Sequence, residues 1–363
     1  MIGIYVHIPF CRTRCPYCDF LRWTTPSAVP SAFVDALCRE IAAFDGPKAA
    51  CSIFCGGGTP SLLAIDDLRR ILDAIGNRFV LEAPEITLEV NADDVNAERA
   101  RAWRDAGINR LSIGVQSFDD AVLRYLGRRH DAVQARKACE AAAAVFDNWS
   151  MDLIFGAPPF KAWTATLEEA LRFAPTHVSA YGLAYEQGTP FEARRADAVN
   201  DETWLALYRE TETILADYAH YEISNYARPG CECRHNLIYW HNEEYAGFGP
   251  GAYSFLDGVR SRNTDDLDPY LAEPGRRIEN LRLTNREIRL ETVIQYLRLR
   301  EGLPKRVYAD RFGNTVESDF GVALHALAGH GLIEETATAW RPTSRGFELN
   351  NEIGLALVSG RGA

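Results

Sequence analysis

Three cysteines near the start of the chain have a spacing that could hold iron and sulfide. Cys11, Cys15 and Cys18 follow a short apolar run, with three residues between the first two and two between the last two. Cysteine thiolates are the usual ligands of iron–sulfur clusters, and a closed [4Fe–4S] cluster takes four of them. Three thiolates leave one iron for a small molecule to complete. The spacing therefore predicts a cluster at which a reaction takes place.

Zinc is the main alternative metal for these cysteines. Structural zinc takes four ligands, which commonly come as two close pairs of cysteine or histidine. This segment lacks the second pair, so we favour iron and sulfide. Arg12 and Arg14 lie within the loop, where positive charge would favour the thiolate form. An equally good interpretation is that both arginines are solvated loop charges.

The wider pattern resembles the radical S-adenosylmethionine (radical SAM) superfamily. Residues 5–11 read Tyr-Val-His-Ile-Pro-Phe-Cys and residues 56–60 read Gly-Gly-Gly-Thr-Pro. Both resemble the branch of the oxygen-independent coproporphyrinogen III oxidases, and the resemblance covers almost the whole chain. The dehydrogenases of that branch have a longer N-terminal arm and a further cysteine two residues after the third, where this chain has Asp19 and Phe20. This departure favours the HemW-type haem chaperones.

Short apolar runs alternate with amphipathic stretches in the first half of the chain. Such alternation predicts parallel strands that are joined by helices. The expected strands are residues 2–8, 51–55, 86–91, 110–116, 150–155 and 177–183, and the expected helices include 32–44, 66–79, 97–106 and 133–145. The pattern leaves open whether the sheet is flat or curled, and the resemblance implies an incomplete (β/α)6 barrel over residues 1–195.

Polar residues and glycines gather where the predicted strands end. The cysteine loop follows the first strand and residues 56–60 follow the second. Later strands end at or carry Glu89, Asn91, Gln116, Asp152 and Tyr181. Parallel α/β folds build their sites at the carboxyl ends of the strands. We therefore expect one shared pocket there.

The resemblance implies that this pocket binds SAM, whose amino and carboxylate groups would complete the open iron. The implied SAM contacts are Tyr5, Tyr17, Gly57, Gly58, Thr59, Glu89, Gln116, Arg128, Asp152 and Ala184. Glu89 suits the ribose hydroxyls, and Arg128 suits the SAM carboxylate as a bidentate donor. Asp152 stands in an apolar run and needs a partner. The alternatives are a glycine turn without a ligand and an exposed helix arginine at position 128, next to Arg129.

A second motif, His-Asn-Leu-Ile-Tyr-Trp, occupies residues 235–240. It resembles the His-Asn-x-x-Tyr-Trp signature of HemW-type proteins, which implies that His235, Tyr239 and Trp240 contact haem. A neutral imidazole is a common axial ligand, and aromatic rings offer a flat apolar wall. A lone histidine is more often a hydrogen-bonded structural residue, and His241 is an alternative ligand. Cys231, Cys233 and His235 also raise a rival metal site, although Cys-x-Cys matches zinc spacing poorly.

Two further units are expected after the barrel. Residues 196–284 would extend the barrel and carry the haem-associated segment, and residues 285–363 resemble a small winged-helix-like domain. Winged helices often bind nucleic acid. The net charge is −11 and the last helix shows no basic face, so we expect no nucleic-acid partner.

The cysteine content predicts a reducing compartment. Nine cysteines are an odd number, and disulfide formation would destroy the three-thiolate motif, so we expect a cytoplasmic location. Cys38, Cys51, Cys55 and Cys139 are expected to be small buried apolar residues. The sequence has no apolar run near twenty residues and no basic leader, which predicts neither a transmembrane helix nor a secretory signal.

The favoured function is a haem chaperone that binds a [4Fe–4S] cluster, SAM and haem and delivers haem to respiratory haemoproteins. An electron donor is an expected partner, and peripheral membrane association stays open. One alternative is an oxygen-independent coproporphyrinogen III dehydrogenase, which decarboxylates porphyrinogen propionates. Another is a radical SAM methyltransferase or haem-degrading relative. A non-catalytic interaction module is least favoured, because an incomplete cluster is costly to maintain without use.

Overall fold

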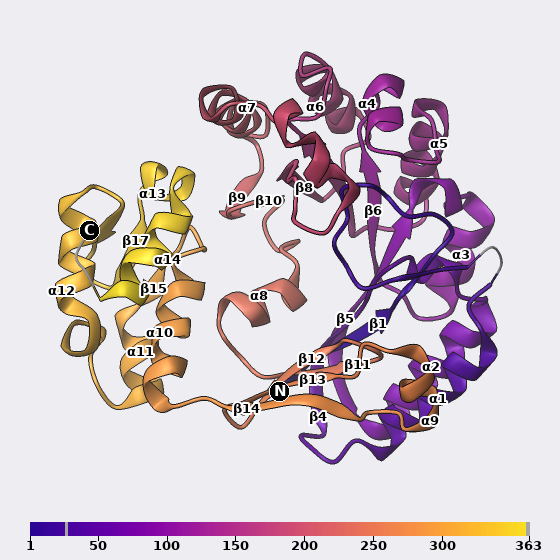
Figure 1. The fold of residues 1–363 in the computed structure, drawn as a ribbon, viewed down its shortest axis with the longest axis horizontal. Helices are drawn as coiled ribbons and strands as arrows, with labels where there is room; N and C mark the ends of the chain where they lie inside the picture. The colour runs from indigo at the N-terminus through magenta and orange to yellow at the C-terminus, as the bar shows by residue number, and fades with distance from the viewer. Residues whose placement is uncertain (26–27, 361–363) are drawn as a thin grey trace.

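The computed structural model describes residues 1–25 and 28–360, and its centre is a curved parallel sheet with helices outside it (Figure 1). Six parallel strands follow one another in chain order across this sheet. They are β1 (Ile2–Ile8), β4 (Ala49–Gly57), β5 (Val80–Asn91), β6 (Arg110–Gln116), β7 (Trp149–Phe155) and β8 (His177–Gly182). All six overlap the predicted strands, which confirms the incomplete (β/α)6 barrel.

The outer helices cover one face of this sheet and bury its apolar side chains. They are α1 (Ser31–Ala43), α2 (Ile65–Arg78), α3 (Ala97–Asp105), α4 (Asp120–Tyr125), α5 (Ala132–Ala143) and α6 (Ala162–Arg172). In β1, Ile2, Ile4 and Val6 are at most 1% exposed and belong to the main core. The intervening Tyr5 and His7 project to the other face, toward the inside of the barrel, because side chains alternate along a strand.

The sheet continues beyond both edges of the six-stranded unit, through strands within residues 196–284 that the sequence pattern did not predict one by one. On one side, β11 (Tyr245–Phe248) pairs in parallel with β1, followed by the antiparallel strands β12 (Tyr253–Leu256), β13 (Val259–Asn263) and β14 (Arg277–Arg282). On the other side, β10 (Asn225–Ala227) and β9 (Ala219–Glu222) lie beyond β8. Most of these strands have three to five residues, too few for a clear periodic signal.

Three helices belong to this extension. They are α7 (Asp201–Ile214), α8 (Arg234–Trp240) and α9 (Leu267–Ala272). Helix α8 packs against β1 and β4 on the inner side of the sheet, and it carries the histidine motif. The 3-10 helices η1 (Pro60–Leu62), η2 (Ala92–Asp94) and η3 (Pro190–Asp197) lie close to the strand ends.

The cysteine loop is fixed at both ends by a short parallel pair of strands, β2 (Phe10–Cys11) and β3 (Trp23–Thr24). The backbone N–H of Thr25 donates to the Cys11 carbonyl at 2.9 Å. The loop that carries Cys15 and Cys18 therefore leaves and returns at one place above β1.

The C-terminal residues form a winged-helix-like unit with its own apolar core. Its elements are α10 (Asn285–Tyr296), β15 (Leu303–Pro304), α11 (Lys305–Phe312), α12 (Val316–Gly329), β16 (Ile333–Glu335), β17 (Ala339–Pro342), α13 (Ser344–Glu348) and α14 (Asn350–Ser359). A reciprocal capping box between Thr284 and Glu287 begins α10. Leu324 and Trp340 are fully buried in this second core. The three strands pair in the order β15-β17-β16.

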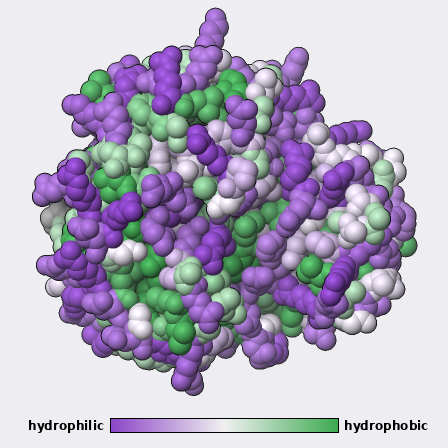
Figure 2. Space-filling model, turned by 180° about the vertical axis from the view of Figure 1, so that it is seen from behind, coloured by the Kyte–Doolittle hydropathy of each residue, from purple (hydrophilic) through white to green (hydrophobic). Residues whose placement is uncertain are grey.

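Figure 2 shows a mostly hydrophilic surface with scattered apolar patches. In residues 1–25 and 28–360, no helix combines the length and apolarity that crossing a membrane requires. All nine cysteines are free thiols. Cys55 and Cys139 are buried as predicted, whereas Cys38 and Cys51 are only half-buried.

Candidate functional site

A cavity of about 460 Å³ opens at the carboxyl ends of the parallel strands. Its lining brings together residues from the cysteine loop and from all strand ends between β4 and β8. The predicted site residues among them are Cys11, Cys15, Tyr17, Cys18, Gly57, Gly58, Thr59, Glu89, Gln116, Arg128, Asp152 and Ala184. Asn91 and Tyr181 line it as well. The residues at the strand ends therefore line one shared pocket.

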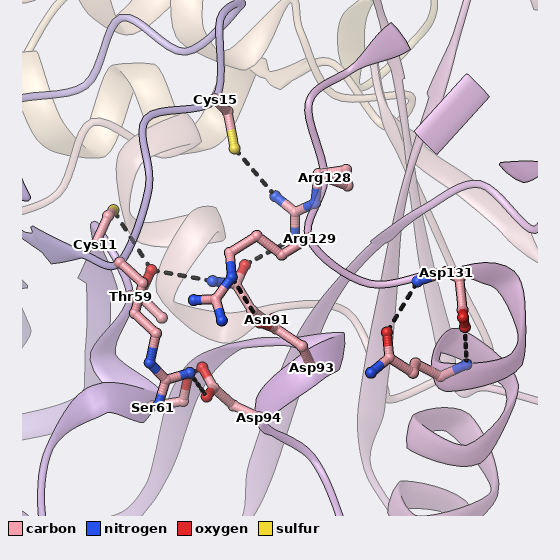
Figure 3. A network of polar contacts seen from close by, with 12 residues as sticks. Cys11, Cys15, Thr59, Ser61, Asn91, Asp93, Asp94, Arg128, Arg129 and Asp131 are labelled. Atoms are coloured by element: carbon pink, nitrogen blue, oxygen red, sulfur yellow. Dashed lines mark hydrogen bonds and ion pairs between the residues drawn. The ribbon is translucent and has the colours of Figure 1, made fainter. Parts of the chain in front are cut away.

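The three cysteines of the loop are half-buried in this pocket. The hydroxyl of Thr59 donates to the Cys11 sulfur at 3.4 Å, and Arg128 Nη1 donates to the Cys15 sulfur at 3.6 Å (Figure 3). Burial raises the pKa of the Cys11 and Cys18 thiols, and positive charge from Arg22 partly opposes this rise. The Cys11 and Cys15 sulfurs thus each accept a hydrogen bond from a neighbouring side chain.

The two interpretations that the sequence left open for Arg12 and Arg14 were an effect on the thiolates and a role as loop charges, and both side chains have partners other than the cysteines. Arg12 forms an ion pair with Asp94, and Arg14 donates to the backbone carbonyl of Gly188 at 3.4 Å. Two other arginines lie next to the thiols. Arg128 donates to the Cys15 sulfur, and Arg22, which donates to the carbonyls of Phe20 and Cys18, brings positive charge near Cys11 and Cys18. Closeness to the cysteines in the sequence therefore does not predict which arginine lies near their sulfurs in the fold.

The donor set of the pocket fits an iron–sulfur cluster better than a single metal ion. Among the described residues, no three His, Cys, Asp or Glu side chains meet closely enough to hold one ion. A cluster places its cysteine ligands on separate irons, so its thiolates need not converge on one point. The rival site at Cys231, Cys233 and His235 is not formed, because Cys233 donates to Glu85 instead.

Two carboxylates line the pocket together with the cysteine loop. Glu89 accepts from the Gly57 backbone N–H at 3.0 Å, and Asp152 accepts from the Ser112 hydroxyl at 3.1 Å. Burial and the negative charge of Asp152 raise the pKa of Glu89 to about 8. Burial also raises the pKa of Asp152, and hydrogen bonds from Ser179 and Ser112 oppose the rise. Ser112 supplies the partner that Asp152 was expected to need, and Glu89 holds its proton near neutral pH.

Arg128 is not an exposed helix arginine. It follows α4 and lies half-buried, with Nη2 donating to Asn91 Oδ1 at 2.8 Å and to the Gly114 carbonyl at 2.9 Å. Its Nη1 donates to Cys15 and to the Tyr17 hydroxyl. To bind a ligand carboxylate through two hydrogen bonds, Arg128 must therefore give up one of its protein acceptors or donate from its Nε–H.

The glycines at the end of β4, Gly57 and Gly58, are required by close packing around them. A Cβ at Gly57, whose φ is +110°, would stand 2.4 Å from the His7 ring, and one at Gly58 would meet the Phe10 backbone at 2.8 Å. The absence of side chains at Gly57 and Gly58 therefore lets β4 approach His7 and Phe10 closely, and it also leaves room in the pocket that both glycines line.

Tyr5 lies outside the described lining of the pocket, contrary to its expected place around the cofactor. Its hydroxyl bonds to His7 Nδ1 at 2.9 Å, and its ring stacks on Phe54 and His235. Tyr5 stands in the middle of β1, so its side chain points into the barrel below the strand ends. Tyr17 does line the pocket and packs on Phe191.

The histidine motif occupies a separate place inside the barrel. His235 is 1% exposed, and its Nδ1 and Nε2 bond to the Ser52 hydroxyl at 2.8 Å and the Tyr239 hydroxyl at 2.9 Å. Burial and the nearby Arg110 lower the pKa of His235 to about 3, so the imidazole is neutral. In this conformation both ring nitrogens are engaged, and neither can ligate iron.

Trp240 lies toward the C-terminal unit, whereas Tyr239 packs edge-on against Tyr245 of β11. Arg298 stacks over the Trp240 ring at 4.5 Å, and Trp240 packs against the C-terminal core. The described lining of the pocket includes none of His235, Tyr239 and Trp240. His241 is more accessible: its side chain is 25% exposed, and Nε2 lies 3.2 Å from Glu301.

Several residues that shape the site had no distinct signal in the sequence. The buried Ser61 and Asp94 form a polar group with the half-buried Arg99. Asn91 was noticed at a strand end but had no assigned role. Two carboxylates, Asp93 and Asp94, follow a predicted strand end. This local pattern could have indicated that Asp94 binds an arginine of the cysteine loop.

Comparisons with known proteins agree on one family. Residues 5–173 match the radical SAM superfamily and residues 283–349 match the HemN C-terminal domain. The chain is 34% identical to the heme chaperone HemW of Bacillus subtilis, covering 97% of this chain and 98% of that protein. It is 34% identical to HemW of Escherichia coli, with 98% of both covered, and 33% identical to HemW of Lactococcus lactis, with 96% and 95% covered.

A solved structure supports the fold. Coproporphyrinogen III oxidase (HemN) from Escherichia coli, a radical SAM enzyme, superposes with a TM-score of 0.85 at 24% identity. The match covers 98% of this chain and 89% of that structure. At this identity the likeness speaks for the fold alone. Members of the radical SAM superfamily use a [4Fe–4S] cluster and SAM. On the full-length identities, the chain belongs to the HemW family of the radical SAM superfamily.

Proposed function

We propose that this protein is a haem chaperone that holds a [4Fe–4S] cluster and SAM in the strand-end pocket and passes haem to recipient haemoproteins. The observation that carries the proposal is the meeting of three cysteines with Glu89 and Arg128 in one cavity, in a chain one-third identical to HemW proteins along its length. The expected recipients are haemoproteins of respiration. We also propose a reducing cytoplasmic location, which the three-cysteine motif supports because disulfide formation would destroy it.

The cysteines would hold three irons, and the pocket wall would position SAM. When bound, the cluster and SAM supply one-electron chemistry, for which the protein provides orientation and exclusion of water. Gly57 and Gly58 bring backbone close to the ligand, and Glu89 and Asp152 offer acceptors for hydroxyl or amino groups. Arg128 offers the cation for a carboxylate. Gln116, Tyr17, Thr59 and Ala184 complete the lining.

We place haem on the segment from His235 to His241. Two imidazoles there can serve as axial ligand, and they differ in access. His235 becomes available only when its bonds to Ser52 and Tyr239 break and α8 moves. His241 is partly exposed, and its ring would have to leave Glu301 and the stacked Tyr296 ring. Tyr239 and Trp240 would supply the aromatic wall.

A haem titration tests this proposal. Wild type should give a Soret shift that saturates at one haem per chain. His235→Ala and His241→Ala identify the ligand, and His325→Ala in the C-terminal unit is the matched control, since its exposed ring bonds to the Gly321 carbonyl and packs edge-on against Trp340. The ligand variant should weaken binding at least tenfold. An unshifted wild-type spectrum would reject the chaperone function.

A second assay separates this function from porphyrinogen decarboxylation. Reconstituted protein is incubated with coproporphyrinogen III, SAM and a reductant. We expect no protoporphyrinogen, in line with the absence of a cysteine two residues after Cys18. Its formation would favour the dehydrogenase.

We further propose three units: the barrel at residues 1–195, its extension at 196–284, and the winged-helix-like unit at 285–363. The separate apolar core around Trp340 supports the last boundary.

A further inference from the structure

A continuous set of hydrogen bonds joins two of the three loop cysteines through side chains below them (Figure 3). Cys11 accepts from Thr59 at 3.4 Å, and Thr59 accepts from Asn91 Nδ2 at 3.1 Å. Asn91 Oδ1 accepts from Arg128 Nη2 at 2.8 Å, and Arg128 Nη1 reaches Cys15 at 3.6 Å. Asn91 stands at the middle of this relay, which runs from Cys11 to Cys15.

The chemistry of the partners fixes the direction of each bond. A guanidinium only donates, so the oxygen of the Asn91 amide must face Arg128 and its nitrogen must face Thr59. The Thr59 oxygen therefore accepts from Asn91, which leaves its own proton for the Cys11 sulfur. The relay thus aims one donor at Cys11 and another at Cys15.

The backbone holds Asn91 and Arg128 in this arrangement. Asn91 is the last residue of β5 and pairs with Gly114 on β6. Arg128 Nη2 donates to both of these neighbours. A Cβ at Gly114 would stand 3.2 Å from that nitrogen, so glycine leaves room for the guanidinium. Thr59 is 3% exposed, which keeps water from competing for its hydroxyl.

We propose that Asn91 is a positioning residue that orients Thr59 and Arg128 as hydrogen-bond donors to the Cys11 and Cys15 ligands of the cluster. This inference rests on the proposed cluster site. Hydrogen bonds to cluster sulfurs stabilise the more negative, reduced state and so raise the reduction potential. Asn91 therefore makes the cluster easier to reduce and slows the loss of its iron.

The test uses Asn91→Asp, which keeps the shape of the side chain. A carboxylate still accepts from Arg128 but cannot donate to Thr59, so the Thr59 hydroxyl turns toward the new carboxylate and away from Cys11. The added charge also lowers the potential by itself. A double-mutant cycle with Thr59→Val separates the two effects, because the charge acts in both backgrounds and the relay acts in only one.

The proteins are reconstituted anaerobically, and the midpoint potential is measured by EPR-monitored titration without SAM. Asn91→Asp should shift the potential to more negative values, and the shift should be clearly smaller in the Thr59→Val background. Iron loss to a chelator should be about tenfold faster in Asn91→Asp than in wild type. Asn109→Asp makes the same exchange at the far end of β6, where Asn109 bonds to the backbone of Pro84 and Ile86, and it should behave as wild type.

Equal shifts in the two backgrounds would overturn the role of Asn91 while leaving the cluster in place. Wild type that holds no iron would reject the cluster itself and, with it, the proposed function. The two failures are therefore distinguishable. Thr59→Val alone, which removes the donor to Cys11 without any added charge, should shift the potential in the same direction and guards against misfolding of the Asn91 variant.

Discussion

Arg12 in the cysteine loop pairs with Asp94 in η2, and this ion pair fastens the loop to the end of β5. The Asp94 side chain is 1% exposed, and it also accepts from Ser61 at 2.7 Å and from Arg99 at 3.3 Å. A buried carboxylate with three donors is a firm anchor, because removing it leaves those donors without an acceptor.

Asp94→Asn should therefore destabilise the protein and loosen the loop. The amide loses both ion pairs and presents N–H groups toward two arginines. We expect the free energy of unfolding to fall by roughly 1–3 kcal/mol in urea titrations. Asp66→Asn is the control: its carboxylate is 91% exposed beside Arg69, and its loss should change little. Equal effects of the two variants would contradict the anchor.

Glu89 should make stability depend on pH. Its folded-state pKa of about 8 exceeds its ordinary value of 4.5, so the folded protein binds more protons than the unfolded chain between these values. Unfolding free energy therefore falls as pH rises from 4.5 to 8 and changes no further above that. Glu89→Gln lacks this loss, so its stability relative to wild type should rise across the window.

Urea titrations of metal-free protein at pH 5 and pH 8.5 measure the difference. We expect a gain of roughly 1–3 kcal/mol for Glu89→Gln between the two pH values, because Glu89 faces the pocket and water there moderates the cost of its charge. Glu98→Gln, on the exposed first turn of α3, provides the control and should follow wild type. A flat difference would show that Glu89 is ionised throughout.

The order of the parallel strands was predictable because each strand is a long apolar run with polar residues at its end. The strands from β9 to β14 were not, because they are short and find their partners through distant pairing. The buried, hydrogen-bonded environment of His235 could not be predicted from the sequence either. Its partner Ser52 is 183 residues away, and only the folded barrel brings the two together. The motif marked His235 as special without telling whether it faces solvent.

Ser52→Ala tests how firmly His235 is held. Both side chains are buried, and the change leaves Nδ1 of a neutral imidazole without its partner. We expect a loss of about 1–3 kcal/mol in unfolding free energy. The same exchange at the exposed Ser344 of α13 should have almost no effect.

The same variant bears on haem. If His235 is the axial ligand, a weaker closed state should speed haem association, as measured by stopped-flow absorbance. Unchanged association in Ser52→Ala, together with weaker binding in His241→Ala, would assign the ligand to His241.

Trp340→Ala tests whether residues 285–363 form a separate unit. Trp340 is fully buried in the C-terminal core, and its Nε1 donates to Glu317 at 2.8 Å. Its truncation should cost about 3–5 kcal/mol locally. Limited proteolysis should then cut within residues 285–363 while iron content after reconstitution stays at the wild-type level. Loss of iron together with proteolysis would mean that the two cores unfold as one.

Iron and sulfide analysis after anaerobic reconstitution tests the central claim most directly. Wild type should hold about four irons and four sulfides per chain. Cys15→Ala should lose them, and Cys139→Ala, a buried thiol remote from the pocket in α5, should keep them. Adding SAM should change the EPR spectrum of the reduced wild-type cluster, since one iron has no protein ligand. A wild-type protein without iron, or a spectrum indifferent to SAM because a fourth side chain is bound, would contradict the account.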